Sequence, residues 1–147
     1  MSLHGPYDQS NIFAKILRGE APCFKAYEDD VALAFMDLFP VSRGHTLVIP
    51  KRAAARNFLD LPTDEVGPFM ARVQRVAQGV ERALTPDGVT IFQFNGAPAG
   101  QTVFHLHFHI VPRWEDMPMG QHGKTPMADK SELEALAAKI AASITAD

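Results

Sequence analysis

Three histidines alternate with apolar residues in one short stretch, and this pattern constrains the fold more than any other feature of the chain. The stretch runs from Val103 to Val111 and reads VFHLHFHIV. Successive side chains of a β-strand point to opposite faces of the sheet. The pattern therefore predicts a strand with one apolar face packed on a core and an exposed face that carries His105, His107 and His109.

This row of imidazoles indicates a functional site, because histidine is seldom placed in such alternation for packing alone. A metal centre and a nucleophile are the two alternatives. Neighbouring histidines could share one metal ion, but the Cα atoms of His105 and His109 would be roughly 13 Å apart at about 3.3 Å per strand residue. The single cysteine, Cys23, leaves a tetrahedral ligand set incomplete. A central His107 nucleophile, oriented and charged by its two neighbours, fits the spacing better.

Composition places the chain among globular proteins and excludes several functions. Its 147 residues, 46% of them hydrophobic, suffice for one domain with its own core. A formal net charge of −3 without a basic run argues against binding to nucleic acid. One cysteine cannot form an intramolecular disulfide, and neither a signal peptide nor an apolar run of about 20 residues is visible. We therefore expect a cytoplasmic protein that binds neither nucleic acid nor a membrane.

Three helices are predicted from apolar residues at helical spacing. The first is short and lies between Asn11, which can cap it, and Gly19. The second is long, is capped by Thr63 and carries acidic residues in its first turn. A capping box at Ser131, with a glutamate three residues later, predicts a C-terminal helix over 131–145.

Five strands are predicted from apolar runs bounded by turn residues. They are expected at residues 24–27, 31–37, 45–49, 89–94 and 103–111, with Pro50 stopping the third. Residues 1–10 are polar, contain glycine and proline, and are expected to form a flexible arm. Residues 113–130 lose all periodicity, as expected of a loop that covers a substrate or contacts a second copy of the chain.

Several residues outside the histidine row are candidates with two interpretations each. Asp37 ends an apolar strand, where it can bond to sugar hydroxyls or simply lie exposed. The loop at 95–101 can bring backbone N–H groups close to an anion, although such loops are also ordinary hairpin turns. Phe13 and Ile16 suit a core or the wall of a flat pocket. No spacing relates His122 to the other histidines.

The histidine row resembles the signature of the histidine triad (HIT) family of nucleotide hydrolases and transferases. Four more segments resemble family motifs, in the family's order: NIFAKI at 11–16, FMD at 35–37, GHTLVIPK at 44–51 and AGQTV at 99–103. Together the motifs cover roughly residues 11–113. The pattern is most similar to the bacterial Hint-like branch.

This resemblance implies an α+β fold with a five-stranded antiparallel sheet, a short N-terminal helix, a long central helix and a C-terminal helix. It further implies a single HIT domain over 11–147, with a loop at 113–130 that varies among relatives, and a homodimer that joins two sheets. The implied reaction is attack by the central histidine on the α-phosphorus of a nucleotide, a purine by family analogy. Water then hydrolyses the nucleotidyl-histidine, as in a nucleoside phosphoramidase.

Carried over by position, the resemblance also implies residue roles. His107 is the nucleophile, and the supporting catalytic residues are His105, His109, His45, Gln101 and Thr102. The nucleotide contacts are Phe13, Ile16, Phe35, Asp37, Leu38, Asn95 and Gly100.

No cofactor and no metal is required by this scheme. Some bacterial relatives bind structural zinc through two cysteines, but Asn11 and Ala14 stand at those positions, so we expect no such zinc site. The alternatives to a phosphoramidase are a dinucleoside polyphosphate hydrolase of the same family and a nucleotide-binding regulatory module with little catalysis. A metal hydrolase is a further alternative, which full activity in a chelator would exclude.

Overall fold

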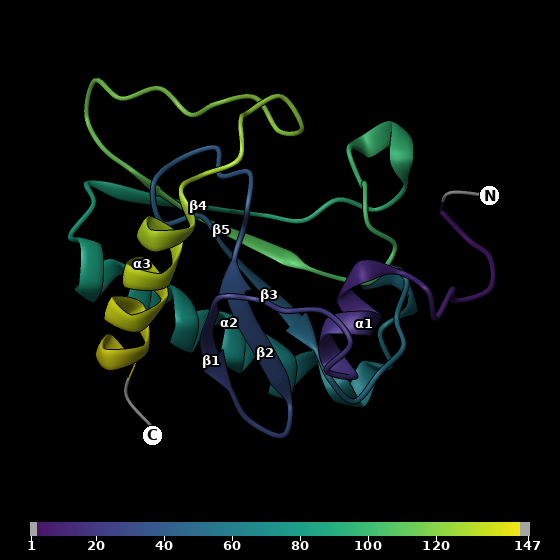
Figure 1. Ribbon diagram of the computed structural model, residues 1–147. Coiled ribbons are helices and arrows are strands. Elements are labelled where there is room, and N and C mark those ends of the chain that lie inside the picture. The colour runs from purple at the N-terminus through teal and green to yellow at the C-terminus, as the bar shows by residue number, and fades with distance from the viewer. Residues whose placement is uncertain (1–2, 145–147) are drawn as a thin grey trace.

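Five antiparallel strands form one sheet in the spatial order β1-β2-β3-β5-β4 (Figure 1). The structure is a computed structural model that describes residues 3–144. The strands are β1 (Lys25–Glu28), β2 (Ala32–Met36), β3 (Thr46–Pro50), β4 (Gly88–Phe92) and β5 (Phe108–Arg113). The helices are α1 (Ile12–Leu17), α2 (Thr63–Leu84) and α3 (Lys130–Ser143). This architecture confirms the expected α+β fold.

The two central strands β2 and β3 are buried on both faces, which explains their continuous apolar sequences. One face packs against α2 and α3 through a large apolar cluster, and Figure 1 shows α2 passing behind the sheet. The other face forms a smaller cluster with α1, in which Phe13 contacts Phe35 with ring centroids 5.3 Å apart. Because strand residues alternate between faces, β2 and β3 contribute to both clusters.

The long helix α2 forms as predicted, but without the predicted cap. Its N-cap residue is Pro62, and no side chain caps the helix there, so the expectation for Thr63 is wrong. At α3 the expected capping box at Ser131 is also absent. Asp129 is the N-cap instead, and its carboxylate accepts a hydrogen bond from the Ser131 N–H. At α1 the Asn11 side chain caps the helix as expected. Residue 145 of the helix expected over 131–145 lies outside the described residues.

The histidine strand is shorter than predicted, because β5 begins only at Phe108. On one side of β5, the β3 residues Thr46 to Val48 pair with Ile110 to Phe108. On the other side, the pairing with β4 ends where Phe92 pairs with His109. Pro50 does not stop β3 but is its last residue, and it has no N–H to offer to a strand beside it. Residues 103–107 therefore have no ladder partner and form an irregular segment.

The alternation of side chains continues through this irregular segment for most of its length. Leu106 and Ile110 are fully buried in the cluster under α2, and Phe108 packs against the same cluster. Phe104 differs from the prediction, because its ring lies 4.4 Å from the Arg56 guanidinium. The apolar face thus fixes the segment, and the histidines lie on the opposite side.

Candidate active site

Pairing between β3 and β5 brings a fourth histidine to the triad. Leu47 of β3 pairs with His109, and His45 immediately precedes β3, so the His45 ring lies next to the His109 ring, with ring centroids 5.1 Å apart. The rings of His107 and His109 are 4.9 Å apart. The expected exposure of the imidazoles is wrong, since the relative exposures of His105, His107 and His109 are 1%, 6% and 1%.

Aromatic rings and the N-terminal arm cover these imidazoles. Phe92 of β4 stacks on His109 at 4.3 Å, and Phe13 of α1 meets His107 edge-on at 4.9 Å. The Tyr7 hydroxyl of the arm is hydrogen-bonded to Nδ1 of His105. The arm has no helix or strand within residues 3–10, yet it also bonds to the domain through the Leu3 carbonyl.

Hydrogen bonds to the backbone define the protonation of His107. Its Nδ1 lies 2.7 Å from the carbonyl oxygen of His105. A carbonyl can only accept a hydrogen bond, so Nδ1 of the neutral ring carries the proton. The proton-free nitrogen is then Nε2, whose lone pair is available to attack an electrophile.

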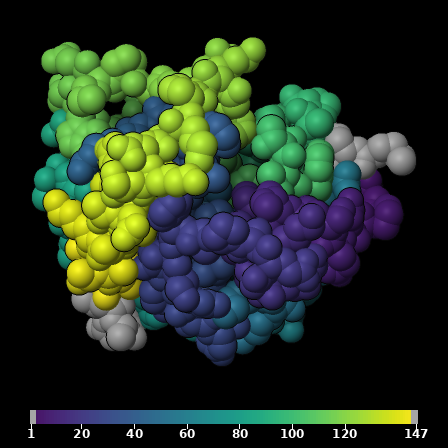
Figure 2. Space-filling view, in the orientation of Figure 1, coloured from purple at the N-terminus to yellow at the C-terminus, as the bar shows by residue number. Residues whose placement is uncertain are grey.

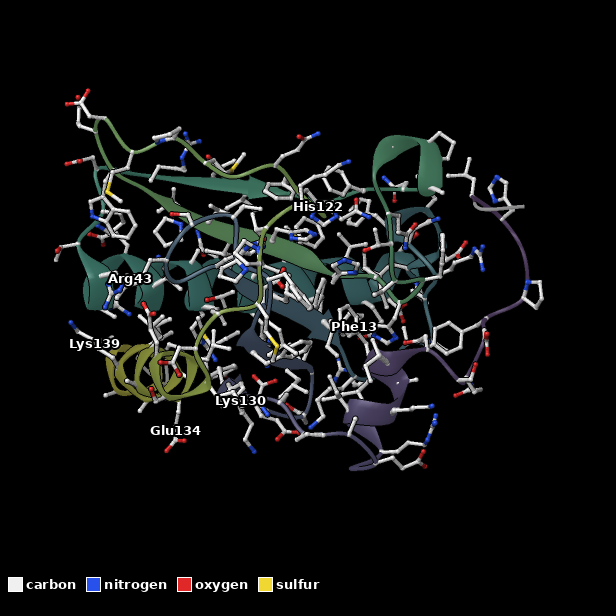
Figure 3. The ribbon with its side chains drawn as sticks, turned by 45° about the horizontal axis from the view of Figure 1, so that its top comes forward. Phe13, Arg43, His122, Lys130, Glu134 and Lys139 are labelled. Carbon is white, nitrogen blue, oxygen red and sulfur yellow. The ribbon has the colours of Figure 1, made fainter. Side chains whose placement is uncertain are left out.

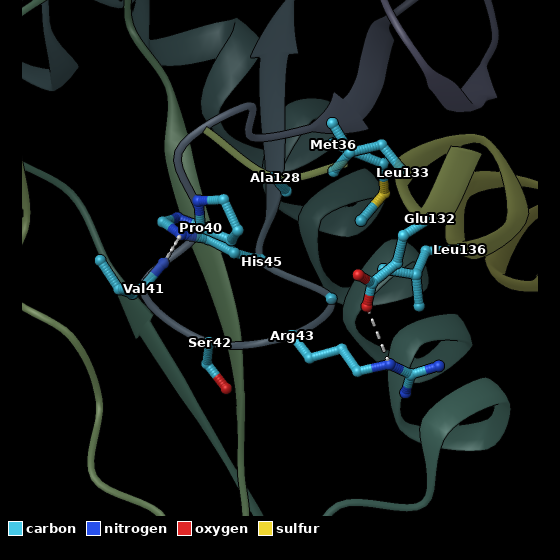
Figure 4. A pocket seen from close by; sticks show the side chains of 11 residues that line it. Met36, Pro40, Val41, Ser42, Arg43, His45, Ala128, Glu132, Leu133 and Leu136 are labelled. Atoms are coloured by element: carbon cyan, nitrogen blue, oxygen red, sulfur yellow. Dashed lines mark hydrogen bonds and ion pairs between the residues drawn. The ribbon is translucent and has the colours of Figure 1, made fainter. Parts of the chain in front are cut away.

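A chain of hydrogen bonds defines the protonation of the other pair in the same way. The Val41 N–H donates to Nδ1 of His45 at 3.1 Å (Figure 4), so the neutral ring carries its proton on Nε2. That Nε2–H donates to Nδ1 of His109 at 2.9 Å. His109 therefore carries its proton on Nε2, and this buried donor has no partner within residues 3–144. It is available for a ligand oxygen.

Burial lowers the pKa of all four histidines, because a charged imidazole loses its hydration there. The pKa falls to about 4 for His105 and His107. It falls to about 3 for His45 and to about 2 for His109, where the neighbouring histidines add to the effect. At neutral pH the rings are uncharged, as a nucleophilic imidazole requires.

These shifts predict that the free energy of unfolding falls between pH 7 and pH 5. An unfolded histidine takes up a proton below about pH 6.5, whereas the buried rings remain neutral until about pH 4 or lower. Each such ring then removes up to about 1.4 kcal/mol of stability per pH unit below 6.5. Burial raises the pKa of Asp37, which offsets part of the loss at the acidic end. Denaturant titrations at both pH values measure the change, and equal stability would contradict it.

The residues expected around the base lie together on the side of α1. Phe13 and Phe35 are in contact, and Ile16 packs on the same apolar cluster beside the triad. Leu38 is partly exposed on the loop after β2. Asp37 instead joins the histidines, since its Oδ2 lies 3.4 Å from Nε2 of His45.

The side chains of two expected site residues, Gln101 and Asn95, form hydrogen bonds within the protein. The buried Gln101 amide donates to the carbonyls of Arg56 and Val103 and accepts from the Gly96 N–H. It thereby holds the loop at 95–101, and both of its N–H donors are engaged there. Asn95 likewise uses its Oδ1 to accept from the Phe58 N–H.

Two other residues of this loop remain compatible with a bound ligand. Gly100 has φ +114°, and a Cβ there would lie 3.1 Å from the Phe94 ring, so only glycine fits without strain. Thr102 is exposed and can present its hydroxyl.

His122 lies beside this site, although no pattern in the sequence indicates it. It lies on the loop between β5 and α3, and Figure 3 shows it against the β4–β5 side of the sheet. Its ring is 5.3 Å from His109 and 5.2 Å from Phe94. Periodicity cannot indicate such a residue, because the loop that carries it has none.

Asp37, His45 and His109 lie close enough together to be considered as ligands of one metal ion. One ligand atom of each residue lies within 4.8 Å of those of the other two. However, the Val41 N–H donor directs the proton of His45 to Nε2, so the nitrogen facing the group lacks a free lone pair. These residues therefore fit a hydrogen-bond chain better than a metal ion.

Behind His45, a cavity of ≈ 240 Å³ is lined mainly by the 40–44 loop and α3 (Figure 4).

The zinc site of some relatives does not fit this chain either. Asn11 uses its side-chain oxygen to cap α1 by accepting from the Ala14 N–H at 2.9 Å. Ala14 is buried and has no ligand atom.

Comparisons with known proteins decide the family. The family model described as HIT domain matches residues 18–116, which include the triad and His45. The chain belongs to the HIT family. A solved HIT-like protein of Bartonella henselae is 45% identical with a TM-score of 0.86, and the match covers 95% of this chain and 100% of that one. The Hint-like assignment and the fold are thus confirmed.

Two curated HIT relatives have named activities. The adenosine 5′-monophosphoramidase of Schizosaccharomyces pombe is 36% identical over 92% of this chain and 98% of that protein. The adenylylsulfatase HINT3 of Arabidopsis thaliana is 40% identical over 71% of this chain, but the match spans 52% of the plant protein. A zinc-bound histidine triad protein of Mycobacterium smegmatis is 34% identical, with a TM-score of 0.77 and coverage of 92% and 93%.

The helices of residues 3–144 include none with the length and apolar character of a membrane span.

Proposed function

We propose that this HIT protein is a nucleotidyl hydrolase that acts at the α-phosphate of a purine nucleotide, with a phosphoramidate as its preferred substrate. The observation that carries the proposal is the proton-free Nε2 of His107, fixed by the bond from Nδ1 to the His105 carbonyl. The phosphoramidase and the adenylylsulfatase among the relatives support it, since each is named for a reaction of an adenylyl compound.

The reaction consists of two displacements at phosphorus. The Nε2 lone pair of His107 attacks the α-phosphorus and forms a phosphorus–nitrogen bond. The bond to the leaving nitrogen breaks, and that nitrogen keeps the electron pair, takes up a proton from solvent and leaves as the amine. The positive charge that develops on the ring is stabilised by the Nδ1–H bond to the His105 carbonyl. Water then attacks the phosphorus of the nucleotidyl-histidine and loses a proton to solvent, and the bond from phosphorus to Nε2 breaks. The products are the nucleoside monophosphate and His107 with its Nε2 lone pair restored. No metal takes part.

His109 is suited to bind the phosphoryl group during both steps. Its Nε2–H is a buried donor without a partner, and a donor fixed in advance stabilises charge that develops on phosphoryl oxygens. The Thr102 hydroxyl is a second candidate donor. Phe13, Ile16 and Phe35 would contact the base, and Asp37 the ribose.

We further propose a homodimer, as the family resemblance implies. β4 forms one edge of the sheet, so its outer backbone groups have no strand partner within residues 3–144. Ile91 on this strand is 47% exposed, which leaves apolar area for a second copy to cover.

Wild-type protein tests the substrate class with adenosine 5′-phosphoramidate and a diadenosine polyphosphate, each assayed with and without EDTA. We expect kcat/KM to be at least about tenfold higher for the phosphoramidate, since the pocket must discriminate by differential transition-state binding. We expect EDTA to have no effect. Activity that is lost in EDTA and restored by a divalent cation would contradict the mechanism. Faster cleavage of the polyphosphate, or AMP binding without turnover, would favour the alternatives.

A further inference from the structure

His122 is held over the site by three hydrogen bonds between its loop and residues 38–41. The Gly120 N–H donates to the Val41 carbonyl at 2.7 Å, two residues before His122. The Thr125 hydroxyl donates to the Phe39 carbonyl at 2.9 Å, three residues after it. Farther along, the Ala128 N–H donates to a carbonyl of the same segment. In Figure 2 the yellow-green end of this loop lies across the blue segment that precedes β3.

The anchored segment also defines the protonation of the histidine chain, because Val41 supplies the N–H that bonds to His45. Val41 therefore bonds both to the loop, through its carbonyl, and to the hydrogen-bonded histidines, through its N–H. Residue His122 is the point at which the loop reaches the triad, with its ring perpendicular to that of His109 at 87°.

The two rings share an unusual property. Within the described residues, Nε2 of His109 and Nε2 of His122 are both buried and both lack a hydrogen-bond partner. Buried polar nitrogens are nearly always paired, so two unpaired ones on adjacent rings mark a place where a ligand can form hydrogen bonds. The protonation chain gives His109 a donor at this atom. A neutral His122 ring that carries its proton on Nε2 offers a second donor beside it, and a phosphoryl group can accept from both with its several oxygens.

We propose that His122 is a fifth histidine of the active site and donates a hydrogen bond from Nε2 to the phosphoryl group that His107 attacks. His122 and His109 together then bind the phosphoryl oxygens as charge accumulates on them in the transition state. The inference rests on the proposed function, since it assigns the phosphoryl group of that reaction to the two unpaired nitrogens. It adds a substrate contact from the loop at 114–129.

Two substitutions of His122 separate this role from simple packing. His122→Phe keeps a ring against His109 and Phe94 but removes the donor, whereas His122→Gln keeps an N–H donor and removes the ring. If His122 binds the phosphoryl group, kcat for adenosine 5′-phosphoramidate falls about 10²-fold in the Phe variant with little change in KM. The Gln variant then retains more activity than the Phe variant. Gln121→Ala, an exposed change in the same loop, should stay within about twofold of wild type.

The opposite order overturns the inference. If the Phe variant keeps wild-type kcat and the Gln variant loses it, His122 only packs against the site. Absence of turnover in the wild type would instead contradict the proposed function, and binding then decides the role of His122. In that case His122→Phe should weaken AMP binding about tenfold and leave adenosine binding unchanged, because only AMP carries the phosphate. Unchanged AMP binding would exclude the contact.

Discussion

His107→Ala lowers kcat/KM for adenosine 5′-phosphoramidate by at least about 10⁴-fold, because the variant loses the atom that forms the covalent bond to phosphorus. The neighbouring histidines cannot replace it. Nε2 of His105 lies 3.2 Å from the Pro50 carbonyl and therefore carries the proton, so its Nδ1 accepts from Tyr7. Nδ1 of His109 accepts from His45, so neither ring presents a free lone pair to the substrate. The measurement is steady-state hydrolysis in EDTA at neutral pH.

A matched control comes from a histidine outside the site. His4 is exposed in the N-terminal arm, so His4→Ala should hydrolyse the substrate at the wild-type rate. Thermal unfolding shows that His107→Ala is folded before its activity is interpreted. A folded variant that retains more than about a tenth of wild-type kcat/KM would contradict the nucleophile assignment.

Phe69→Ala lowers the free energy of unfolding by about 3–5 kcal/mol, the largest effect on stability that we expect from one substitution. Phe69 of α2 is 0% exposed and contacts the ring of Phe108 at 5.9 Å. Phe108 lies between His107 and His109 at the start of β5, so the cavity would open directly beneath the histidines. Urea titration of wild type and variant measures the loss.

Gln78→Ala on the exposed side of the same helix is the control, and its stability should stay within about 0.5 kcal/mol of wild type. Phe69→Leu should be less destabilising than Phe69→Ala, because leucine fills most of the space that alanine leaves as a cavity. A loss below about 1 kcal/mol for Phe69→Ala would show that α2 does not support the histidine segment as described.

Elements with a strong local pattern could be predicted from the sequence, and α2 is the best example. Apolar residues at helical spacing predict one long helix there, and the structure has it at Thr63–Leu84. Alternation alone likewise predicts that Leu106 and Ile110 lie on the buried side of the histidine segment, and both are fully buried. The start of β5 could not be predicted in this way. It depends on where the backbone pairing of β5 with β3 and β4 ends, which is a property of the folded sheet.

The chemistry of the site depends on contacts that no local pattern contains. The His105 carbonyl determines which nitrogen of His107 carries the proton. The Val41 N–H determines the same for His45. The side-chain amide of Gln101 forms hydrogen bonds that hold the loop at 95–101. His122 reaches the triad through loop anchors far away in the sequence, such as that between Thr125 and Phe39. The histidine spacing could identify the nucleophile but not this arrangement.

The stereochemical course at phosphorus tests the covalent mechanism most directly. The wild-type protein hydrolyses an adenosine 5′-phosphoramidothioate of defined configuration in ¹⁸O-labelled water, and the configuration of the product is determined. Two in-line displacements, first by Nε2 of His107 and then by water, each invert the phosphorus, so net retention is expected. This result does not require the intermediate to accumulate. Net inversion would mean that water attacks the substrate directly and would contradict a nucleotidyl-histidine.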